Sequence, residues 1–531
     1  MNILLIAINA KYIHSSLAAY SLYAYLGEDE KKHVQINEFT VNQSEELITS
    51  EIFRAKPDVL AFSCYIWNID LVLSLAETFK KIMPHVPIIV GGPEVSYEFS
   101  SELVDVVVSG EGETQFRQLV RGYIALGDKT SELCNTELAP PLDQIPFPYE
   151  NRFSSLANRI IYYETSRGCV NSCGFCLSSA TKGVRFLSLP RVYSDLDKFL
   201  TAKVKQVKFV DRTFNASKHH ATAIWEYLIN NDNGITNFHF EIAGERLDSQ
   251  ILNLLKKARK GLFQFEIGVQ STNPQTLETI HRTTDTEKLF ENVRSIMEFG
   301  NIHLHLDLIV GLPHENYESF KRSFNDVFAL RPHKLQVGFL KLLKGSKLRE
   351  DAHKYGIEYK KNAPYSILKN DFIDFGQINH IKKIEHMVET FYTAAFRSTV
   401  KFMLLRFPSP FDFFDKLAMF WEENELHMVS HKKAAMYLHL YEFSKSYLKE
   451  ELHIICELLK FDMLLQENVR TFPSFIAAYY QPDNRQITRT TGVHVFNYNI
   501  YEWLENDVPL IQKQTKVEFD YSRAIDDGRL R

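Results

Sequence analysis

Apolar segments typical of buried β-strands recur along residues 159–348, and amphipathic segments typical of helices separate them. Each strand–helix repeat spans roughly thirty residues, enough for a helical crossover between two parallel strands. Right-handed crossovers then place such strands side by side with helices on one face. The six expected strands lie in 159–168, 204–215, 237–248, 262–273, 302–315 and 335–348. This part of the chain is therefore expected to form a partial (β/α)6 barrel.

A second α/β pattern occupies the beginning of the chain. Buried-strand runs occur in "NILLIAI", "KPDVLAFSCYIWN", "VPIIVGGPE" and "VDVVVSGEGE", with helical segments between them. This pattern predicts a doubly wound, Rossmann-like sheet, which binds ligands at the carboxyl ends of its strands. Small or polar residues stand at those ends, among them Asn9, Ser63 and Gly91. The G-x-G-x-x-G fingerprint is missing, which argues against a nicotinamide cofactor.

Three of the six cysteines lie in one short stretch, "SRGCVNSCGFCLSSA". Cys169, Cys173 and Cys176 have the spacing Cys-x3-Cys-x2-Cys. A structural zinc site needs four ligands, and no fourth stands nearby. Three thiolates on one loop can instead hold three irons of a [4Fe–4S] cluster and leave the fourth iron open. A zinc loop and a pair of redox thiols remain the alternatives at this point.

The cysteine spacing, the aromatic Phe175 before the third cysteine and the preceding strand together resemble the signature of the radical S-adenosylmethionine (SAM) enzymes. The resemblance implies that the open iron binds SAM and that cleavage of SAM yields a deoxyadenosyl radical. It implies a partial barrel, with SAM contacts along the ends of its strands. The family's Gly-Gly-Glu motif is replaced by "VDRTFN" in this chain. The SAM contacts implied are Phe175, Asp211, Glu245, Gln270, Ser271 and Gly311.

The stretches "VGGPEVS" and "DVVVSGEGETQF" resemble the cobalamin (B12)-binding domain of B12-dependent radical SAM enzymes. The Asp-x-His-x-x-Gly motif that supplies a histidine to cobalt is absent, and His14 and His85 lack its spacing. Cobalamin is therefore expected without a histidine lower ligand, with Tyr65 or Trp67 against the corrin face. A core role for Trp67 and a domain that binds no corrinoid are the alternatives. The cobalamin contacts implied are Asn9, Ser63, Trp67, Asn68, Gly91, Gly92, Pro93, Glu94, Gly110 and Glu111.

These patterns divide the chain into four parts. Residues 1–137 are expected to form the Rossmann-like cobalamin-binding domain, and the Pro-rich stretch 138–158 resembles the linker of that family. Residues 159–354 would form the barrel. Residues 355–531 read as a mainly α-helical domain of unknown role, which indicates a branch of the family with an uncharacterised helical C-terminal domain.

Composition excludes some functions. The net charge is −5, so nothing draws the whole chain to nucleic acid or anionic membrane, and no nucleic-acid-binding patch is evident. No apolar run reaches the roughly 20 residues that span a bilayer. The first residues read as a strand and not as a signal peptide. Six cysteines in 531 residues form no disulfide framework, so a reducing, cytoplasmic location is expected.

Methyl transfer to an unactivated carbon of an unknown substrate is the function that the resemblance implies first. A carbon radical does not readily attack the methyl group of SAM, and cobalamin as methyl carrier resolves this mismatch. The alternatives are a cobalamin-dependent radical rearrangement, cyclisation or reduction, and a non-catalytic sensor that binds corrinoid or cluster. An external electron donor of the flavodoxin or ferredoxin type is implied. No catalytic side chain is identified from the sequence.

Overall fold

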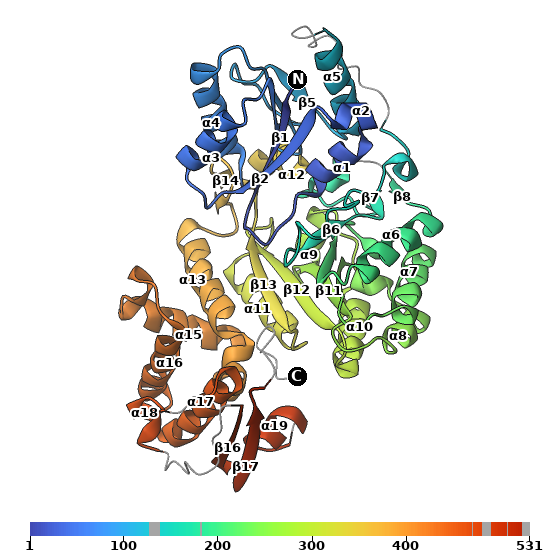
Figure 1. Ribbon diagram of the computed structural model, residues 1–531. Helices are drawn as coiled ribbons and strands as arrows, with labels where there is room; N and C mark the ends of the chain where they lie inside the picture. The colour runs from blue at the N-terminus through green and yellow to red at the C-terminus, as the bar shows by residue number, and fades with distance from the viewer. Residues whose placement is uncertain (127–138, 181–182, 470, 480–489, 507, 523–531) are drawn as a thin grey trace. The chain divides into compact units, whose positions relative to one another are not determined.

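A computed structural model of the protein describes residues 1–126, 139–180, 183–469, 471–479, 490–506 and 508–522 (Figure 1). The chain divides into two compact units. The first contains Met1–Ser323 with the later segments Leu330–His333 and Val337–Phe375, and the second contains the other residues. Among the described residues, no helix combines the length and the apolar character needed to cross a membrane.

The first unit begins with a parallel five-stranded sheet in the order β2-β1-β3-β4-β5 (Figure 1). Strand order reverses between β1 and β3, and in doubly wound sheets ligands bind at such a switch point, beyond the carboxyl ends of the strands. Asn9 and Ser63 end the two strands at this point. The strands are β1 (Ile3–Asn9), β2 (Val34–Thr40), β3 (Val59–Ser63), β4 (Ile88–Gly91) and β5 (Val106–Val108).

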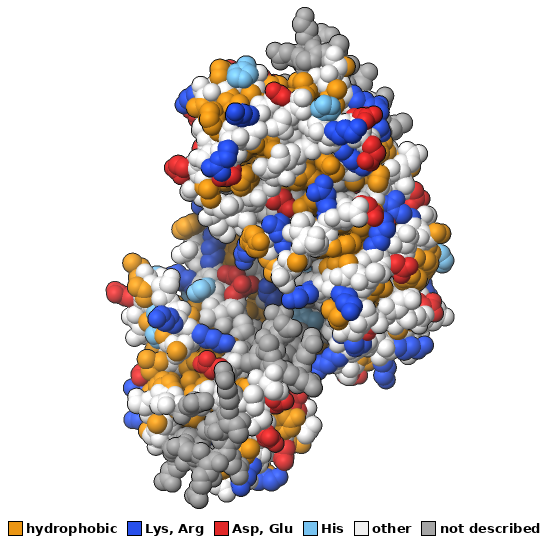
Figure 2. Space-filling model, viewed as in Figure 1, with side chains coloured by type: hydrophobic (Ala, Val, Ile, Leu, Met, Phe, Trp, Pro, Cys, Tyr) orange, Lys and Arg blue, Asp and Glu red, His pale blue; other side chains and the backbone are white. Residues whose placement is uncertain are grey.

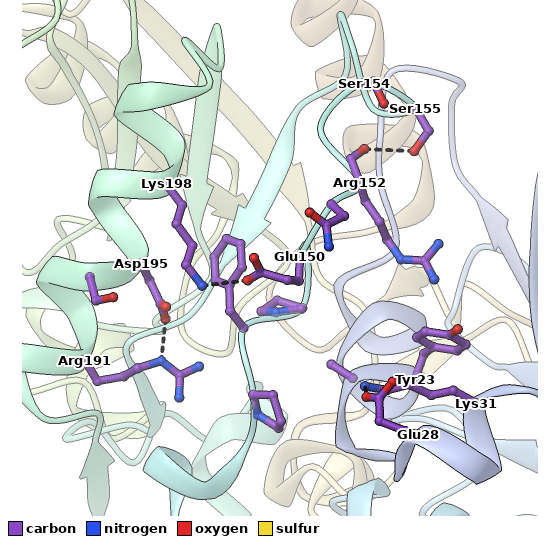
Figure 3. A pocket seen from close by; sticks show the side chains of 16 residues that line it. Tyr23, Glu28, Lys31, Glu150, Arg152, Ser154, Ser155, Arg191, Asp195 and Lys198 are labelled. Atoms are coloured by element: carbon purple, nitrogen blue, oxygen red, sulfur yellow. Dashed lines mark hydrogen bonds and ion pairs between the residues drawn. The ribbon is translucent and has the colours of Figure 1, made fainter.

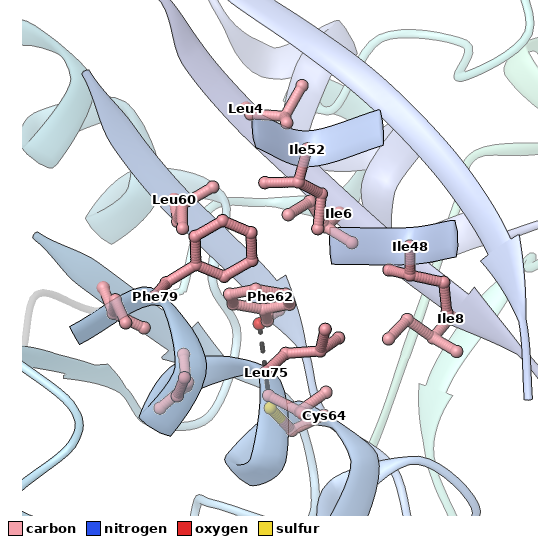
Figure 4. Close-up of a cluster of buried hydrophobic side chains, with 14 of the residues drawn as sticks. Leu4, Ile6, Ile8, Ile48, Ile52, Leu60, Phe62, Cys64, Leu75 and Phe79 are labelled. Atoms are coloured by element: carbon pink, nitrogen blue, oxygen red, sulfur yellow. Dashed lines mark hydrogen bonds between the residues drawn. The ribbon is translucent and has the colours of Figure 1, made fainter. Parts of the chain in front are cut away.

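Strand β1 is buried along its whole length because helices cover both faces of this sheet. Leu4, Ile6 and Ile8 pack into a cluster with side chains of two helices on one face (Figure 4). The alternate residues of β1 pack with two other helices on the opposite face. The first pair of helices is α3 (Glu45–Arg54) and α4 (Ile69–Ile82), and the second is α1 (Leu17–Tyr25) and α5 (Glu113–Leu126); the short α2 is Glu28–Lys31.

A second sheet of six strands follows, in the order β13-β12-β11-β10-β9-β6. Neighbours from β6 to β12 pair in parallel, and β6 and β13 stand at opposite ends of the sheet. The partial (β/α)6 barrel expected from the sequence is thus confirmed. Its strands are β6 (Ile161–Tyr163), β9 (Gln206–Phe209), β10 (Asn237–Glu241), β11 (Phe263–Gln270), β12 (His303–Val310) and β13 (Lys334–Phe339). Its helices are α6 (Leu189–Thr201), α7 (Lys218–Asn230), α8 (Ser249–Leu255), α9 (Pro274–Thr279), α10 (Thr286–Phe299) and α11 (Tyr317–Phe328).

The Pro-rich connection between the two sheets is packed against both of them. Tyr149 is fully buried, and its hydroxyl donates to the carbonyl of Tyr162 on β6 at 2.6 Å. Its ring lies 5.4 Å from that of Tyr20 on α1 and 6.3 Å from that of Phe199 on α6. The expected boundary at 137/138, like Cys134, lies outside the described residues.

The second unit is mainly helical, as the sequence predicts. The buried carboxylate of Asp462 accepts hydrogen bonds from the backbone amides and hydroxyls of Ser398 and Thr399, which fixes the first turn of α14. Burial raises the pKa of Asp462 to about 6. An antiparallel hairpin, β16 (Thr491–Tyr498) with β17 (Gln512–Asp520), completes the unit. The helices are α13 (Phe375–Phe391), α14 (Arg397–Leu404), α15 (Pro410–Glu423), α16 (Lys433–Tyr447), α17 (Leu452–Gln466), α18 (Ser474–Ala477) and α19 (Ile500–Asn506).

Candidate functional site

The cysteine loop begins directly after β7 (Ser166–Gly168) and leads to β8 (Val184–Phe186), which pairs with β7 in the antiparallel sense. Gly168 has a φ of +103°, and a Cβ atom added there would stand 2.1 Å from the carbonyl oxygen of Gly183. Only glycine fits this close approach. Further along the loop, the amide of Gly174 donates to Ile280 at 2.9 Å, and its carbonyl accepts from the amide of Leu348 at 2.7 Å. The start and the middle of the loop are therefore fixed by backbone contacts.

The three thiols differ in exposure. Cys173 is buried, whereas Cys169 and Cys176 are half-buried. Burial raises the pKa of the Cys173 thiol, and the neighbouring guanidinium of Arg282, whose Nη1 lies 3.8 Å from the sulfur, acts in the opposite direction. The hydroxyl of Thr213 lies 3.4 Å from the sulfur of Cys169. The cation beside Cys173 favours the thiolate of this residue, which is the form that binds metal.

The sulfurs are not gathered as the ligands of one zinc ion. With Zn–S bonds of about 2.3 Å, the ligands of a single zinc lie within roughly 4 Å of one another. Among the described residues, three side chains that could bind a metal have ligand atoms within 4.8 Å of one another. They are Glu266, His305 and Asp307. The three cysteines do not form such a set among the described residues.

Asp211, a predicted SAM contact, is almost fully buried beneath the strand that leads to the cysteine loop. Its carboxylate accepts hydrogen bonds from the amide and hydroxyl of Thr165, at 3.0 and 2.7 Å, and from the hydroxyl of Ser166 at 2.5 Å. Burial raises the pKa of Asp211 to about 6. The expected single strand over 159–168 is interrupted here into β6 and β7. The position of Asp211 fits a role in holding this turn.

Gln270 lies at the end of β11, where a bulge breaks the pairing with β12. Its φ is +72°, and its side chain folds back over Gly268, whose added Cβ would stand 2.1 Å from the Gln270 amide nitrogen. The carbonyl of Gly268 accepts a hydrogen bond of 2.6 Å from Arg282, the same residue that contacts Cys173. The fold thus brings Gln270 next to the cysteine loop.

Other predicted SAM contacts have partners elsewhere in the chain. Ser271 is fully buried and donates to Glu315 at 2.6 Å. Gly311 has a φ of +90° and stands against Ile367, and its carbonyl accepts from the side chain of Asn370 at 2.9 Å. Glu245 lies in a 3-10 turn after β10, with one carboxylate oxygen buried and without a hydrogen-bond partner. Phe175 is half-buried in the cysteine loop itself.

One face of the barrel sheet carries ionisable side chains that the sequence-based prediction did not bring together. Glu266 on β11 accepts a hydrogen bond from Lys208 at 3.0 Å, and Nε2 of His239 lies 3.1 Å from its carboxylate. Burial alone would raise the pKa of Glu266, but His239 and Lys208 outweigh it and the pKa is lowered. His305 and Asp307 on β12 complete the cluster. A polar residue at every second position of "NFHFEI", "FQFEIG" and "HLHLDL" is the signal that could have revealed this face.

The predicted cobalamin residues lie at the carboxyl ends of β1, β3 and β4 and in the loops that follow β3, β4 and β5. Asn68 is buried and holds its loop, because its amide donates to the carbonyls of Ile8 and Ser63 at 3.0 Å each. Asn9 donates to Glu38 at 2.7 Å. Gly92 has a φ of +116°, and an added Cβ would stand 2.5 Å from the carbonyl of Cys64. The other predicted cobalamin contacts at this edge are Gly91, Pro93, Glu94, Gly110 and Glu111.

Trp67 offers a flat apolar face at this edge. It is 46% exposed, which argues against the core role that the sequence left open. Its ring stacks on that of Tyr65 at 4.4 Å with an interplanar angle of 7°, and its indole nitrogen donates to Ile8 at 3.0 Å. A rigid, stacked aromatic pair suits contact with a large planar ligand such as a corrin.

Three histidines of this domain differ in their distance from the ligand-binding edge. His33 and His85 precede β2 and β4, and so lie at the amino ends of the strands, away from that edge. His14 lies in the loop after β1, where its Nδ1 atom is 2.7 Å from the hydroxyl of Tyr162.

The cysteine loop and the loop after β5 share one cation that sequence reasoning missed. Arg167, two residues before Cys169, forms ion pairs of 2.6 Å with Glu111, 2.5 Å with Glu113 and 2.6 Å with Glu164. These carboxylates raise the pKa of Arg167 although burial opposes them. Arg185 pairs with Glu111 from the other side. Glu111 and Glu113 lie 56 and 54 residues from Arg167 in the sequence, so no local pattern predicts their part in the cluster.

Comparison with known families matches three segments of the chain. Residues 3–120 match the B12 binding domain, and residues 163–327 match the radical SAM superfamily. The chain is a B12-binding-domain radical SAM protein. Residues 353–521 match a family described as a protein of unknown function, DUF4080. The family and fold class expected from the sequence are confirmed.

Curated relatives of this radical SAM protein include methyltransferases. It is 26% identical over 356 residues to the cobalamin-dependent radical SAM methyltransferase TokK of Streptomyces tokunonensis, covering 57% of this chain and 50% of TokK. It is 27% identical over 329 residues to the 2-(S-pantetheinyl)-carbapenam-3-carboxylate methyltransferase of Streptantibioticus cattleyicolor, covering 52% and 46%. The chain thus spans about half the length of the curated relatives it matches.

The fold also matches a solved structure of this class. The cobalamin-dependent SAM radical enzyme OxsB, with aqua-cobalamin bound, superposes with a TM-score of 0.59 at 15% identity. The match covers 87% of this chain and 79% of OxsB. At this identity the match establishes the shared fold alone.

A cavity of about 710 Å³ opens beside the Pro-rich connection of this radical SAM protein (Figure 3). Its charged walls largely neutralise one another, since Lys198 pairs with Glu150 at 2.7 Å and Arg191 pairs with Asp195 at 2.9 Å. None of the predicted cofactor residues lines it. On the described residues of the face in view, Figure 2 shows basic and acidic side chains interspersed, without the single-sign patch that nucleic-acid binding needs.

Glu315 gives the radical SAM domain a pH-dependent contribution to stability. It is 1% exposed and accepts from Ser271 and Ser323, and burial raises its pKa from 4.5 to about 7. The folded state therefore favours the protonated carboxyl group of Glu315. The stability that this preference contributes is fully present below about pH 4.5 and is lost as the pH rises through 7.

Glu315→Gln is expected to unfold at higher temperature than wild type at pH 8, with a gain of up to about 3 kcal/mol, and to lose this advantage toward pH 5. Thermal unfolding across this pH range measures the difference, with Glu318→Gln, an exposed neighbour, as the control. A difference that does not change with pH would contradict the prediction.

Proposed function

We propose that this protein transfers a methyl group to an unactivated carbon of its substrate with the aid of a [4Fe–4S] cluster, SAM and cobalamin. When bound, the cluster and SAM supply hydrogen abstraction from the substrate, and cobalamin supplies the methyl group. The observation that carries the proposal is the Arg167 ion-pair cluster, which ties the cysteine loop to the loop after β5 within one compact unit. Relatives that are methyltransferases support it.

The cluster would be held by Cys169, Cys173 and Cys176. The chemistry of this donor set fits an iron–sulfur cluster with an open iron, because three thiols are present and no fourth cysteine is near them in sequence. Arg282 donates toward Cys173 and supports its thiolate form. Phe175, Glu245 and Gln270 are the proposed direct SAM contacts. Asp211, Ser271 and Gly311 act by holding the strand ends that carry those contacts.

Cobalamin would lie at the carboxyl edge of the first sheet. The loops there carry small residues together with the exposed ring of Trp67, which stacks on the half-buried ring of Tyr65. Gly110 has open space around its Cα, since an added Cβ would meet no atom within 4 Å. This opening allows a large ligand to approach the backbone. The chain's part is to bind the corrin face without a histidine to cobalt and to orient it toward the substrate.

A radical SAM protein needs an external reductant, and we propose one of the flavodoxin or ferredoxin type. The low cysteine content of the chain and the thiolates that would hold the cluster fit a reducing compartment, so we propose the cytoplasm as the location. The alternatives of rearrangement, cyclisation or reduction without methyl transfer, and of a non-catalytic sensor, are not favoured by the relatives.

Product analysis tests the proposal without knowledge of the substrate. The reconstituted, reduced protein is incubated with SAM carrying a labelled methyl group. Methyl transfer predicts S-adenosylhomocysteine alongside 5′-deoxyadenosine and methionine, and it predicts that S-adenosylhomocysteine disappears when cobalamin is left out. Deoxyadenosine and methionine without S-adenosylhomocysteine would support rearrangement instead. Protein that yields none of these products would support the sensor.

A further inference from the structure

We propose that residues 343–349, which we call the bridging segment, fix the separation between the loop after β4 and the cysteine loop, with Lys344 as a positioning residue. The inference rests on the proposed function, because these loops matter together only if cobalamin and the cluster serve one reaction. The segment follows β13 and includes the short helix α12 (Lys347–Glu350). It is not among the residues that the sequence indicates for either cofactor.

One end of the bridging segment holds the cysteine loop. The amide of Leu348 donates to the carbonyl of Gly174 at 2.7 Å, and Gly174 stands between Cys173 and Phe175. Leu348 is 4% exposed, so this hydrogen bond is shielded from water. Because the Gly174 amide is bonded to Ile280, the loop is held from two sides at its middle cysteine.

The other end holds the loop after β4. Lys344 Nζ lies 3.1 Å from the carboxylate of Glu94, which also accepts a hydrogen bond from the hydroxyl of Tyr365. Glu94 is 5% exposed. Gly345 has a φ of +77°, and an added Cβ would stand 2.5 Å from the ring of Tyr97, so the backbone lies directly on that ring.

Between these contacts the segment is short and internally bonded. Ser346 is 1% exposed, and its amide and hydroxyl both donate to the carbonyl of Leu343, at 3.0 and 2.7 Å. Arg349 donates to Leu342 at 2.7 Å and pairs with Glu98 at 2.9 Å. A displacement of one loop is therefore carried to the other.

This arrangement changes the role expected of Glu94. The sequence indicates a cobalamin contact, yet Lys344 and Tyr365 occupy its carboxylate. A buried carboxylate that loses its cation moves or takes up water, and its loop moves with it. Misplacement of about 1 Å between reacting groups costs on the order of a hundredfold in rate. Loss of Lys344 is therefore expected to affect methyl transfer more than cofactor binding.

The test compares Lys344→Met with Lys347→Met. Lys347 belongs to the same segment but lies on the surface, where it pairs with Glu350 at 2.9 Å and Asp351 at 3.6 Å. Both variants are expected to bind iron and cobalt as wild type does. In Lys344→Met alone, S-adenosylhomocysteine formation is expected to fall about tenfold or more while deoxyadenosine formation changes less than about twofold. The magnetic interaction between the reduced cluster and cob(II)alamin is also expected to change in Lys344→Met. Equal behaviour of the two variants would overturn the proposal.

Hydrogen exchange in the cofactor-free protein separates failure of this inference from failure of the proposed function. Lys344→Met is expected to speed exchange at the Leu348 amide and in residues 92–98, and Lys347→Met is not. Unchanged exchange in Lys344→Met would overturn the inference whatever the activity of wild type. The double variant Glu94→Gln with Lys344→Met also removes the Glu94 carboxylate, which the single variant leaves without its cation. It is expected to be more thermally stable than Lys344→Met while keeping the faster hydrogen exchange. If stability and slow exchange return together, the positioning role of Lys344 is contradicted.

Discussion

Replacing Cys173 by alanine is expected to remove nearly all iron from the reconstituted protein and to leave cobalamin bound. Cys173 is the most buried of the three thiols and the one that Arg282 contacts, so neither water nor a neighbouring side chain replaces it. Two remaining thiolates do not hold a cluster that needs three protein ligands. Deoxyadenosine and S-adenosylhomocysteine formation are expected to stop together. Metal analysis and product analysis of the same sample measure these effects.

Cys456→Ala is the matched control for this substitution. Cys456 is a buried thiol of the second unit, and its sulfur lies 3.5 Å from the carbonyl of Phe475. The variant is expected to keep the iron and cobalt content of wild type. Iron retained by Cys173→Ala, or cobalt lost with it, would contradict the assignment of the two cofactors to separate loops.

Replacing Arg167 by methionine is expected to lower the free energy of unfolding of the first unit by roughly 3 kcal/mol at pH 7. The substitution leaves Glu111, Glu113 and Glu164 close together without their shared cation. In wild type burial raises the pKa of Glu111, but Arg185 and Arg167 hold it below its usual value. The substitution therefore raises this pKa, and stability is lost as the pH rises through it. The destabilisation is expected to be smaller at pH 5 than at pH 7. Denaturant unfolding at the two pH values measures it.

Arg185→Met provides the comparison for the Arg167 variant. Arg185 is 40% exposed and pairs with Glu111 at the edge of the same cluster. Its loss is expected to cost less than about 1 kcal/mol, because an exposed ion pair contributes little. Equal destabilisation by both variants, or an effect of Arg167→Met that does not depend on pH, would contradict the role given to the cluster.

Most of the fold follows from local patterns in the sequence. Strands such as β3 are buried and apolar and are followed by amphipathic helices, which suffices to predict parallel α/β units. The edge strand β2 was missed because "VQINEFT" carries polar residues at exposed or half-buried positions. The break between β6 and β7 was missed because it depends on Asp211, a residue far along the chain.

The site could be predicted only where its residues are close in sequence. The cysteine loop is a local motif, and the comparison with the radical SAM superfamily agrees with it. Arg167, Arg282 and Lys344 act through contacts with distant residues, which spacing does not reveal. Ser271 and Glu94 stand at the expected strand ends, but each has a partner within the protein. Side-chain direction depends on tertiary packing, so sequence position alone did not settle their roles.

Anaerobic reconstitution with iron, sulfide and hydroxocobalamin tests the central claim most directly. The metals are counted, and the electron paramagnetic resonance spectrum of the reduced cluster is recorded with and without SAM. The account predicts about four irons and one cobalt per chain, and a cluster spectrum that changes when SAM binds the open iron. A single bound zinc, or a cluster whose spectrum ignores SAM, would contradict it.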